Sequence, residues 1–329
     1  MSVYHLWEPY PRIQGVNILQ DRHIAFDNQS TRLSFEKLKK MGANSVAFVP
    51  FIDQENDNSL TLNISESVTR EQLLAGIQFA QQVGLRIILK PQILIDDSWA
   101  GAVNHNSDSK WLKWFEAYEN IIIDYAVLAQ KEQVDILVIG TELNQAEKRP
   151  EWISLIANVR LLYSGEISYC AQNIEGLKNF AHWQLLDSAS LSLYPSLGES
   201  GKPAEIINII DNQSKELRNF TEQHDTPLWI AEIGIASRQG AFQEPWEWQS
   251  KQSQKGLVDE LLQAQVLHFW LEALEGGWNR GVLVWAWYNA PNAGGSIDNG
   301  FSPQNKMAEN ILACHWQGPC PHPQLLESI

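Results

Sequence analysis

The chain has 329 residues, of which 44% are hydrophobic and 19% charged, so it can bury a large core. Its formal net charge of −15 argues against nucleic acids and anionic membranes as partners and favours a neutral substrate. No run approaches the roughly 18 apolar residues that a transmembrane helix needs.

Eight short apolar stretches predict buried parallel strands, because strands covered on both faces lose the alternation of apolar and polar residues. They lie at residues 13–19, 44–50, 85–91, 135–140, 166–170, 189–194, 228–231 and 282–287. Amphipathic stretches that predict helices lie at 34–41, 69–83, 110–130, 150–162, 204–224, 252–274 and 305–314, and segment 174–186 is less clearly helical. Eight alternations favour a closed (β/α)8 TIM barrel, as a single domain over residues 1–329. A doubly wound open sheet is disfavoured because no glycine-rich phosphate loop follows any strand.

Two loops after predicted strands are long enough to be functional, at residues 92–109 and 234–249. The second contains Trp246 and Trp248 among acidic residues and a proline. Core packing accounts for most of the 14 tryptophans. We expect at least one of these two loop tryptophans to contact a ligand, because binding residues concentrate in loops.

Two glutamates follow predicted strands: Glu142 comes after the fourth and Glu232 after the seventh. A carboxylate at the C-terminal end of a barrel strand points into the mouth, where barrel enzymes carry out their chemistry. Taken singly, either could be a structural hydrogen-bond acceptor or a helix cap. Together they offer what cleavage of a glycosidic bond needs, one group to protonate the leaving oxygen and another to attack or to activate water.

This placement is the pattern of the large clan of retaining barrel glycosidases. More closely, the chain resembles the β-mannanases of glycoside hydrolase family 113. The resembling stretches are residues 41–46, 84–91, 139–143, 229–234 and 302–306. The resemblance implies Glu142 as acid/base, Glu232 as nucleophile and β-mannan or manno-oligosaccharides as substrate, without a cofactor. A retaining mechanism requires the two carboxyl groups about 5–5.5 Å apart and a raised pKa for the acid.

The sequence departs from these relatives at two positions. The wider clan usually carries asparagine immediately before the acid/base, where it binds the substrate 2-hydroxyl, and here Thr141 stands there. After Lys90 and a proline we would expect histidine, and the chain has Gln92. The choice between mannose and glucose therefore stays open.

Further substrate-binding candidates stand at other strand ends. Tyr194 is expected to donate a hydrogen bond that keeps the nucleophile ionised, although it could instead pack at the turn before a proline. Lys90 is either a donor to sugar hydroxyls or the partner of an acidic neighbour. Asn17 and Asn289 are weaker candidates for sugar contacts.

Trp287 is expected to form the floor of the cleavage subsite. Because side chains alternate along a strand, Trp285 and Trp287 should face the same side, so both point inward if one does. In that case the deeper of the two would fill the barrel.

The three cysteines, Cys170, Cys314 and Cys320, give an odd count without a disulfide framework, which favours a reducing compartment. The N-terminus lacks a basic segment followed by an apolar one, so we expect a cytoplasmic protein. Cys314 and His315 with Cys320 and His322 superficially resemble a zinc site. The segment also holds two prolines and a glycine, and we interpret it as a chance cluster, so no metal is expected.

Two alternatives remain open. A carbohydrate-binding barrel without catalysis would be consistent with Thr141 and Gln92, although both glutamates are present. A transglycosidase or β-glucan-type hydrolase of the same clan would use the same double displacement on another acceptor or sugar. Sequence alone indicates neither linkage, endo or exo mode, nor oligomeric state.

Overall fold

The computed structural model describes residues 12–224, 226–248, 256–318 and 320. The barrel strands are β1 (Ile13–Leu19), β2 (Ser45–Phe48), β5 (Arg86–Leu89), β7 (Ile136–Thr141), β8 (Glu166–Gln172), β9 (Ser188–Ser192), β10 (Leu228–Ile233) and β11 (Asn279–Tyr288). They close in the order β1-β11-β10-β9-β8-β7-β5-β2, and every pair is parallel. The predicted (β/α)8 barrel is confirmed, and each expected strand overlaps an observed one.

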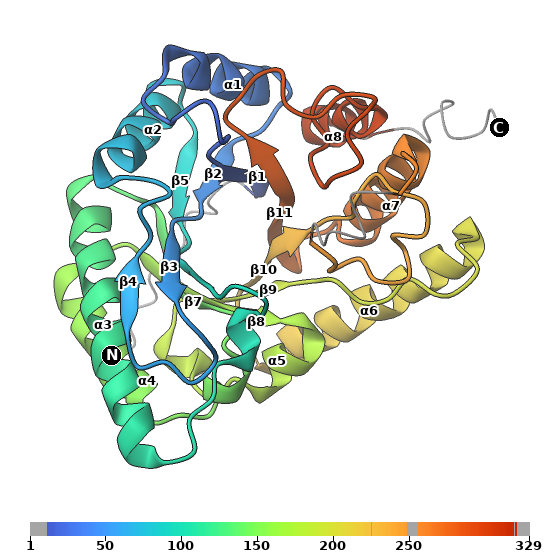
Figure 1. Cartoon of the computed structure of the whole chain (residues 1–329). Coiled ribbons are helices and arrows are strands. Elements are labelled where there is room, and N and C mark those ends of the chain that lie inside the picture. The colour runs from blue at the N-terminus through green and yellow to red at the C-terminus, as the bar shows by residue number, and fades with distance from the viewer. Residues whose placement is uncertain (1–11, 225, 249–255, 319, 321–329) are drawn as a thin grey trace, which may run out of the picture.

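Helices surround the barrel as an outer layer (Figure 1). They are α1 (Gln29–Lys40), α2 (Arg70–Gln82), α3 (Asp108–Lys131), α4 (Glu151–Leu162), α5 (Asn173–Asn179), α6 (Pro203–His224), α7 (Glu260–Ala273) and α8 (Met307–Gln317). Polar side chains cap the N-termini of two of these helices: Thr69 and Gln72 form a capping box at α2, and Asp259 caps α7. The unclear segment 174–186 contains the short α5 and one 3₁₀ turn, Trp183–Leu185.

Apolar residues fill two regions, one between barrel and helices and one inside the barrel. The inner cluster consists of Ile13, Ala47, Ile88, Ile136, Val138, Cys170, Trp229, Ala231 and Leu283. These side chains make the barrel a packed core rather than a pore. Buried charged groups, Lys90 and Glu232, stand at or just beyond the C-terminal ends of β5 and β10, which places the polar site at the mouth.

A small sheet that the sequence did not predict extends from the loops after β2 and β5. It pairs β3 (Phe51–Gln54) with β4 (Leu62–Ile64) and β6 (Gln92–Leu94) in the order β4-β3-β6. Each strand has only three or four residues, too few to show a periodic pattern. The Trp114 indole of α3 donates to Gln54 (2.9 Å), so the sheet is attached to the helix layer.

Cysteine pairing differs from the expectation. Cys314 at the end of α8 and Cys320 form a disulfide, while Cys170 is a buried free thiol. The expectation that these cysteines form no disulfide is therefore wrong for Cys314 and Cys320. An odd number of cysteines does not exclude a disulfide, because one bridge and one buried free thiol also add up to three. The argument for a reducing compartment loses this support, and a cytoplasmic location stays a prediction.

Within the described residues, every helix is too short or too polar to cross a membrane.

Candidate active site

Glu232 lies in β10 and is 4% exposed. Its carboxylate is held from both sides: Lys90 donates to Oε1 as a buried ion pair, and the Tyr194 hydroxyl donates to Oε2 (3.1 Å). Of the two roles considered for Lys90, the structure supports the acidic partner, and the expected hydrogen bond from Tyr194 is present. Burial, followed by the neighbouring carboxylates, raises the pKa of Tyr194 well above its usual value, so this group stays a donor. Two donors, one of them cationic, therefore hold and orient the Glu232 carboxylate.

Glu142 follows the last residue of β7 and has a different environment. Its backbone adopts a left-handed conformation (φ 56°), and its amide donates to Cys170 O (2.8 Å). The Ser192 hydroxyl at the end of β9 donates to Glu142 Oε1. Burial, and then the negative charge of Glu232, raise the pKa of Glu142 to about 7, against the opposing effects of Ser192 and Lys90. The mouth therefore carries one stabilised carboxylate and one carboxyl that can be protonated near neutral pH.

Ser192 supplies a test of how Glu142 titrates. If Glu142 acts as an acid, kcat/KM should fall as pH rises through its pKa, because the proton to be donated is lost. The Ser192 hydrogen bond stabilises the carboxylate and lowers that pKa, so Ser192→Ala should raise it. We expect the alkaline limb of the pH profile to move upward by roughly one unit.

Ser190→Ala is the matched control for this pH experiment. Ser190 lies in the same strand, and its hydroxyl donates to Tyr169 O (2.9 Å) rather than to Glu142. Its pH profile should coincide with that of the wild type. If the alkaline limb of the Ser192→Ala pH profile stays in place or moves to lower pH, Glu142 is not the group that titrates on this limb.

Aromatic rings line one side of the site. Trp285 lies beneath Lys90, with Nζ 5.2 Å from its ring centroid, and contacts Trp248 (centroids 5.5 Å apart). Trp248 stacks on Phe301 (5.3 Å), which meets Tyr194 edge-on (6.4 Å). Trp248 thus belongs to the wall of the mouth and is 43% exposed, so its face can receive a ligand.

Trp287 does not form the floor of a subsite, and that expectation is wrong. Its side chain is fully buried, and its indole N–H donates to Ser34 of α1 (2.8 Å), so it packs between barrel and helix. Trp285 is the residue that reaches the site. The expectation that both tryptophans face one side fails as well.

A bulge in β11 explains this failure. Val16 pairs with Val284 and Ile18 with Trp287, so two steps along β1 match three along β11. The extra residue breaks the alternation, and Trp285 and Trp287 turn to opposite sides. Bulges are frequent beside active sites, where they redirect a side chain.

Substitution of the two tryptophans should separate binding from stability. Trp285→Ala should lower kcat/KM by about 10–100-fold, because a sugar would lose an aromatic contact. Trp287→Phe should leave the kinetic constants near wild type but cost about 1–3 kcal/mol of unfolding free energy, because the bond to Ser34 is lost. Steady-state kinetics and urea denaturation measure the two effects. The opposite pattern would restore Trp287 as the platform.

Both asparagine candidates are structural. Asn17 is fully buried and donates to Ala231 O (2.8 Å), immediately before Glu232, so it fixes β10 rather than a sugar. Asn289 is also fully buried, and its amide oxygen accepts from the Asp21 backbone N–H (2.7 Å). Its amide nitrogen donates to the loop before α1 and to the helix itself. The expected sugar contacts of both residues are therefore wrong.

The two positions that depart from the relatives lie close to the site. Thr141 is 1% exposed, and its hydroxyl donates to Pro91 O (3.4 Å). Gln92 accepts from Lys90 (3.4 Å) through its side-chain oxygen and is partly exposed. Gln92 therefore remains available at the mouth, whereas the Thr141 hydroxyl already has a partner. Trp246 is 52% exposed in the loop after β10.

A polar pocket lies between the loop that follows Glu142 and helix α5. Asn144 donates to Gln172 (2.5 Å) on its wall. Burial, followed by repulsion from Glu175, raises the pKa of Glu147 in this pocket to about 8. The pocket offers amide and carboxyl groups of the kind that bind sugar hydroxyls.

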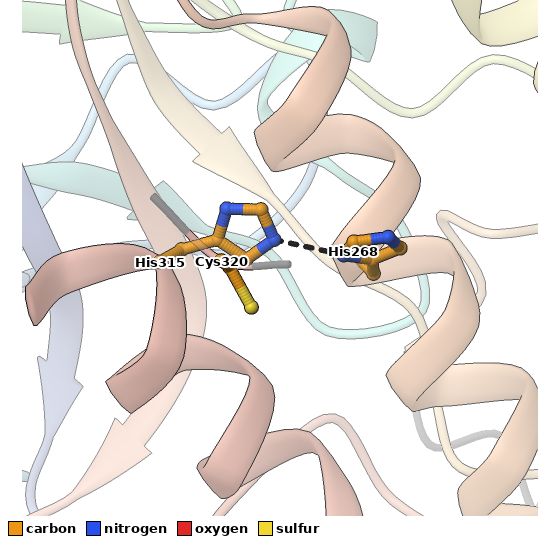
Figure 2. Close-up of side chains that lie close together, drawn as sticks. All are labelled: His268, His315 and Cys320. Carbon is orange, nitrogen blue, oxygen red and sulfur yellow. Dashed lines mark hydrogen bonds between the residues drawn. The ribbon is translucent and has the colours of Figure 1, made fainter. Parts of the chain in front are cut away.

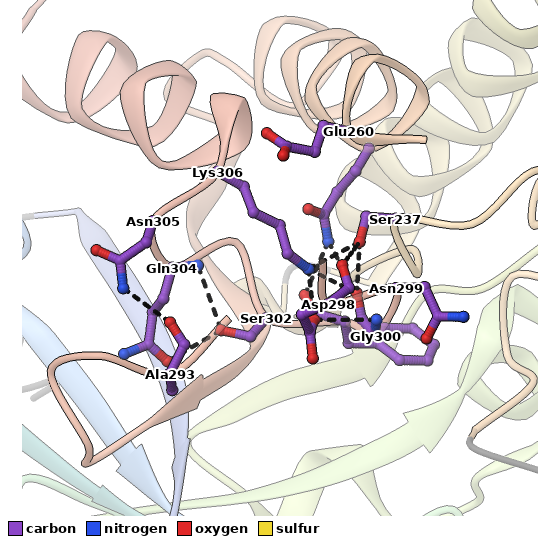
Figure 3. Close-up of polar contacts among 12 residues, drawn as sticks. Ser237, Glu260, Ala293, Asp298, Asn299, Gly300, Ser302, Gln304, Asn305 and Lys306 are labelled. Atoms are coloured by element: carbon purple, nitrogen blue, oxygen red, sulfur yellow. Dashed lines mark hydrogen bonds and ion pairs between the residues drawn. The ribbon is translucent and has the colours of Figure 1, made fainter. Parts of the chain in front are cut away.

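The wall beside the site is fixed by the segment that carries Lys306. Its Nζ donates to Ser237 Oγ (2.7 Å), Asp298 Oδ1 (2.6 Å) and Gly300 O (3.2 Å), joining the loops after β10 and β11 (Figure 3). Gln304 accepts from the backbone N–H of the last residue of β11 (2.6 Å). The resembling stretch 302–306 thus holds the loop that presents Phe301.

Ser192 and Phe301 were missed from the sequence. Ser192 ends the run Ser-Ala-Ser-Leu-Ser, in which small hydroxyl residues alternate with apolar ones. That period of two is a signal that one side of this strand faces a polar space. Phe301 carries no comparable signal, because its position depends on the folding of an irregular loop.

A closed barrel with two unequal carboxyl groups at its mouth is typical of glycoside hydrolases of the (β/α)8 type. The family model "Glycoside Hydrolase Family 113" matches residues 19–306, and the chain belongs to this family. The search of curated protein sequences found no match.

Solved structures agree with this assignment. A GH113 β-1,4-mannanase complex superposes with a TM-score of 0.83 at 25% identity, covering 94% of this chain and 100% of that one. The GH113 β-mannanase AaManA from Alicyclobacillus acidocaldarius gives 0.82 at 24% identity, covering 94% and 98%. A β-glucuronidase from Ruminococcus gnavus gives 0.65 at 14% identity, covering 93% and 50%, and shares the fold.

Proposed function

We propose that the protein is a retaining β-mannanase, with the barrel as its single catalytic domain, Glu232 as nucleophile and Glu142 as acid/base. The main support for this proposal is that the two carboxyl groups have different environments. Lys90 and Tyr194 donate to Glu232, whereas burial and the charge of Glu232 raise the pKa of Glu142 to about 7. Such a difference separates a nucleophile from a general acid.

In the first step, a Glu232 oxygen attacks the anomeric carbon while Glu142 gives its proton to the leaving glycosidic oxygen. The glycosyl–enzyme ester that forms carries no charge on Glu232. Glu142 is now a carboxylate, because it has given up its proton. Burial, the larger cause of its raised pKa, still acts, but the repulsion from Glu232 is gone, so the ionised form of Glu142 is less disfavoured than before. Glu142 accepts a proton from water, the water oxygen attacks the anomeric carbon, and Glu232 departs with the anomeric configuration retained.

Lys90 and Tyr194 serve both steps. They orient the attacking carboxylate in the first and stabilise its returning negative charge in the second. Trp285 and Trp248 provide apolar faces on which a pyranose ring can stack.

Family membership and the β-1,4-mannanase structure at 25% identity support β-1,4-linked mannan or manno-oligosaccharides as the substrate. Mannose differs from glucose in the axial 2-hydroxyl, the group that the clan asparagine binds. Because the Thr141 hydroxyl donates to Pro91 O, recognition of this hydroxyl must come from another group. Gln92 is suited to this role, since it contacts Lys90 and remains partly exposed.

The test is product formation from matched β-linked manno-, gluco- and galacto-oligosaccharides, with Glu232→Gln as the inactive control. Cleavage of manno-oligosaccharides, with the β-anomer seen first by proton NMR, would support both substrate and stereochemistry. Preferred cleavage of gluco-oligosaccharides would replace the mannan assignment. Sugar binding by calorimetry without products would favour the non-catalytic barrel, and longer oligosaccharide products would favour transglycosylation.

A further inference from the structure

Three side chains that can ligate a metal meet away from the barrel mouth, between α7 and the end of α8. They are His268 of α7, His315 in the last turn of α8, and Cys320. Their ligand atoms all lie within 4.8 Å of one another (Figure 2). Cys314, next to His315, adds a second sulfur, because its Sγ is bonded to that of Cys320.

The two imidazoles lie next to each other, with ring centroids 5.1 Å apart and ring planes tilted by 47°. His268 Nδ1 lies 2.9 Å from His315 Nε2, so one proton is shared between two ring nitrogens. Both rings are enclosed by the protein, with side chains only 1% exposed for His268 and 5% exposed for His315. Neutral imidazole is the form that binds a metal, and a divalent cation can replace the shared proton.

Each imidazole also has a carboxylate on its other side. His268 Nε2 lies 3.6 Å from Glu272, and His315 Nδ1 lies 3.8 Å from Glu275. In metal sites, ligating histidines almost always direct the second ring nitrogen to a carboxylate or carbonyl, which orients the ring and raises its basicity. Here the two carboxylates stand beside the second ring nitrogens but beyond hydrogen-bond distance, so each must move closer to complete this arrangement when a metal binds.

We propose that, when the Cys314–Cys320 disulfide is reduced, His268, His315, Cys314 and Cys320 bind one zinc-class divalent cation. Two imidazoles and two thiolates are a preferred tetrahedral set for zinc. Bonds of about 2.0–2.1 Å to nitrogen place the two nitrogens about 3.3 Å apart, so the rings need to separate by only a few tenths of an ångström. The site lies outside the catalytic mouth and is independent of the proposed hydrolysis.

The chemistry balances with a dithiol as reductant. The dithiol reduces the bridge to two cysteine thiols and is itself oxidised to a disulfide. The cation then binds two thiolates and releases two protons. The disulfide and the metal are thus two alternative ways of attaching Cys320 to α8. The metal would also attach Cys320 to α7, through His268. In a reducing compartment the metal would replace the bridge.

The experiment uses untagged full-length protein, reduced with a phosphine under nitrogen, loaded with Zn²⁺ or Co²⁺ and desalted. Reduced wild type should retain one zinc per chain by mass spectrometry and show a cobalt–thiolate charge-transfer band, whereas oxidised protein should show neither. Cys320→Ser and His315→Gln should each lose the band. Glu272→Gln with Glu275→Gln should weaken zinc binding about 10–100-fold. His224→Gln, at an exposed histidine of α6, is the matched control and should bind normally.

Two outcomes would overturn the proposal. Reduced wild type could retain no more zinc than Cys320→Ser, or the band could persist in His315→Gln. Hydrolytic activity, measured on the same samples, should be equal in all of them, because none of these residues lies at the mouth. The double carboxylate variant changes only exposed side chains, so its weaker binding does not reflect misfolding.

Discussion

Replacement of Glu232 by glutamine or alanine is expected to lower turnover of manno-oligosaccharides by about 10⁴-fold or more. Neither side chain can form the glycosyl–enzyme ester, so the double displacement has no first step. The alanine variant should also be less stable by about 3–5 kcal/mol, because it leaves Lys90 buried without its anion. Initial rates and urea denaturation measure the two losses separately.

Glu232→Gln is the cleaner variant, because its amide oxygen can still accept from Lys90 while its amide nitrogen can donate to the Tyr194 hydroxyl oxygen. Glu309→Gln is a matched control: it also removes the anion paired with a lysine, Lys37, but between helices α8 and α1. It should keep most activity. If Glu232→Gln hydrolyses substrate within tenfold of wild type while folded, Glu232 is not the nucleophile.

Glu142→Ala is expected to show a loss that depends on the leaving group. Natural oligosaccharides need a proton on the departing oxygen, and their turnover should fall by about 10²–10⁴-fold. Aryl glycosides with an acidic phenol need little protonation, so their first step should stay fast and the glycosyl–enzyme should accumulate. A burst of phenol followed by a slow steady state, measured by stopped flow, would show this.

Azide gives a second readout for this variant. A small anion can enter the space left by the Glu142 side chain and attack the glycosyl–enzyme without a general base. Steady-state rates on aryl glycosides should therefore rise with azide and yield a β-glycosyl azide, whereas the wild type should not respond. Equal losses on activated and natural substrates would contradict the acid/base role.

The barrel was predictable because its strands and helices follow the periodicity of buried elements, and every expected strand was found. The placement of Glu142 and Glu232 followed from the same logic, since strand ends of a closed barrel converge. Tyr194 could be proposed as a donor for the same reason, and the structure shows its bond to Glu232.

The remaining errors have local causes that a regular pattern cannot reveal. The bulge in β11 reversed the expected orientation of Trp287. Asn17 and Asn289 stand near strand ends but donate to backbone oxygens that only the tertiary structure brings near. The histidine cluster joins residues 47 positions apart, and the spacing of Cys314 and Cys320 alone gave no sign of His268.

The left-handed backbone at Glu142 has an evolutionary consequence. A side chain with a β-carbon is strained at this φ, and asparagine or glycine would adopt it more readily. The neighbouring charge of Glu232 adds further cost to the ionised form. The residue that best suits the local fold is therefore not the one present. If selection acted only on folding, this glutamate should be replaced early. Its persistence in related sequences would therefore indicate that selection has maintained the catalytic function.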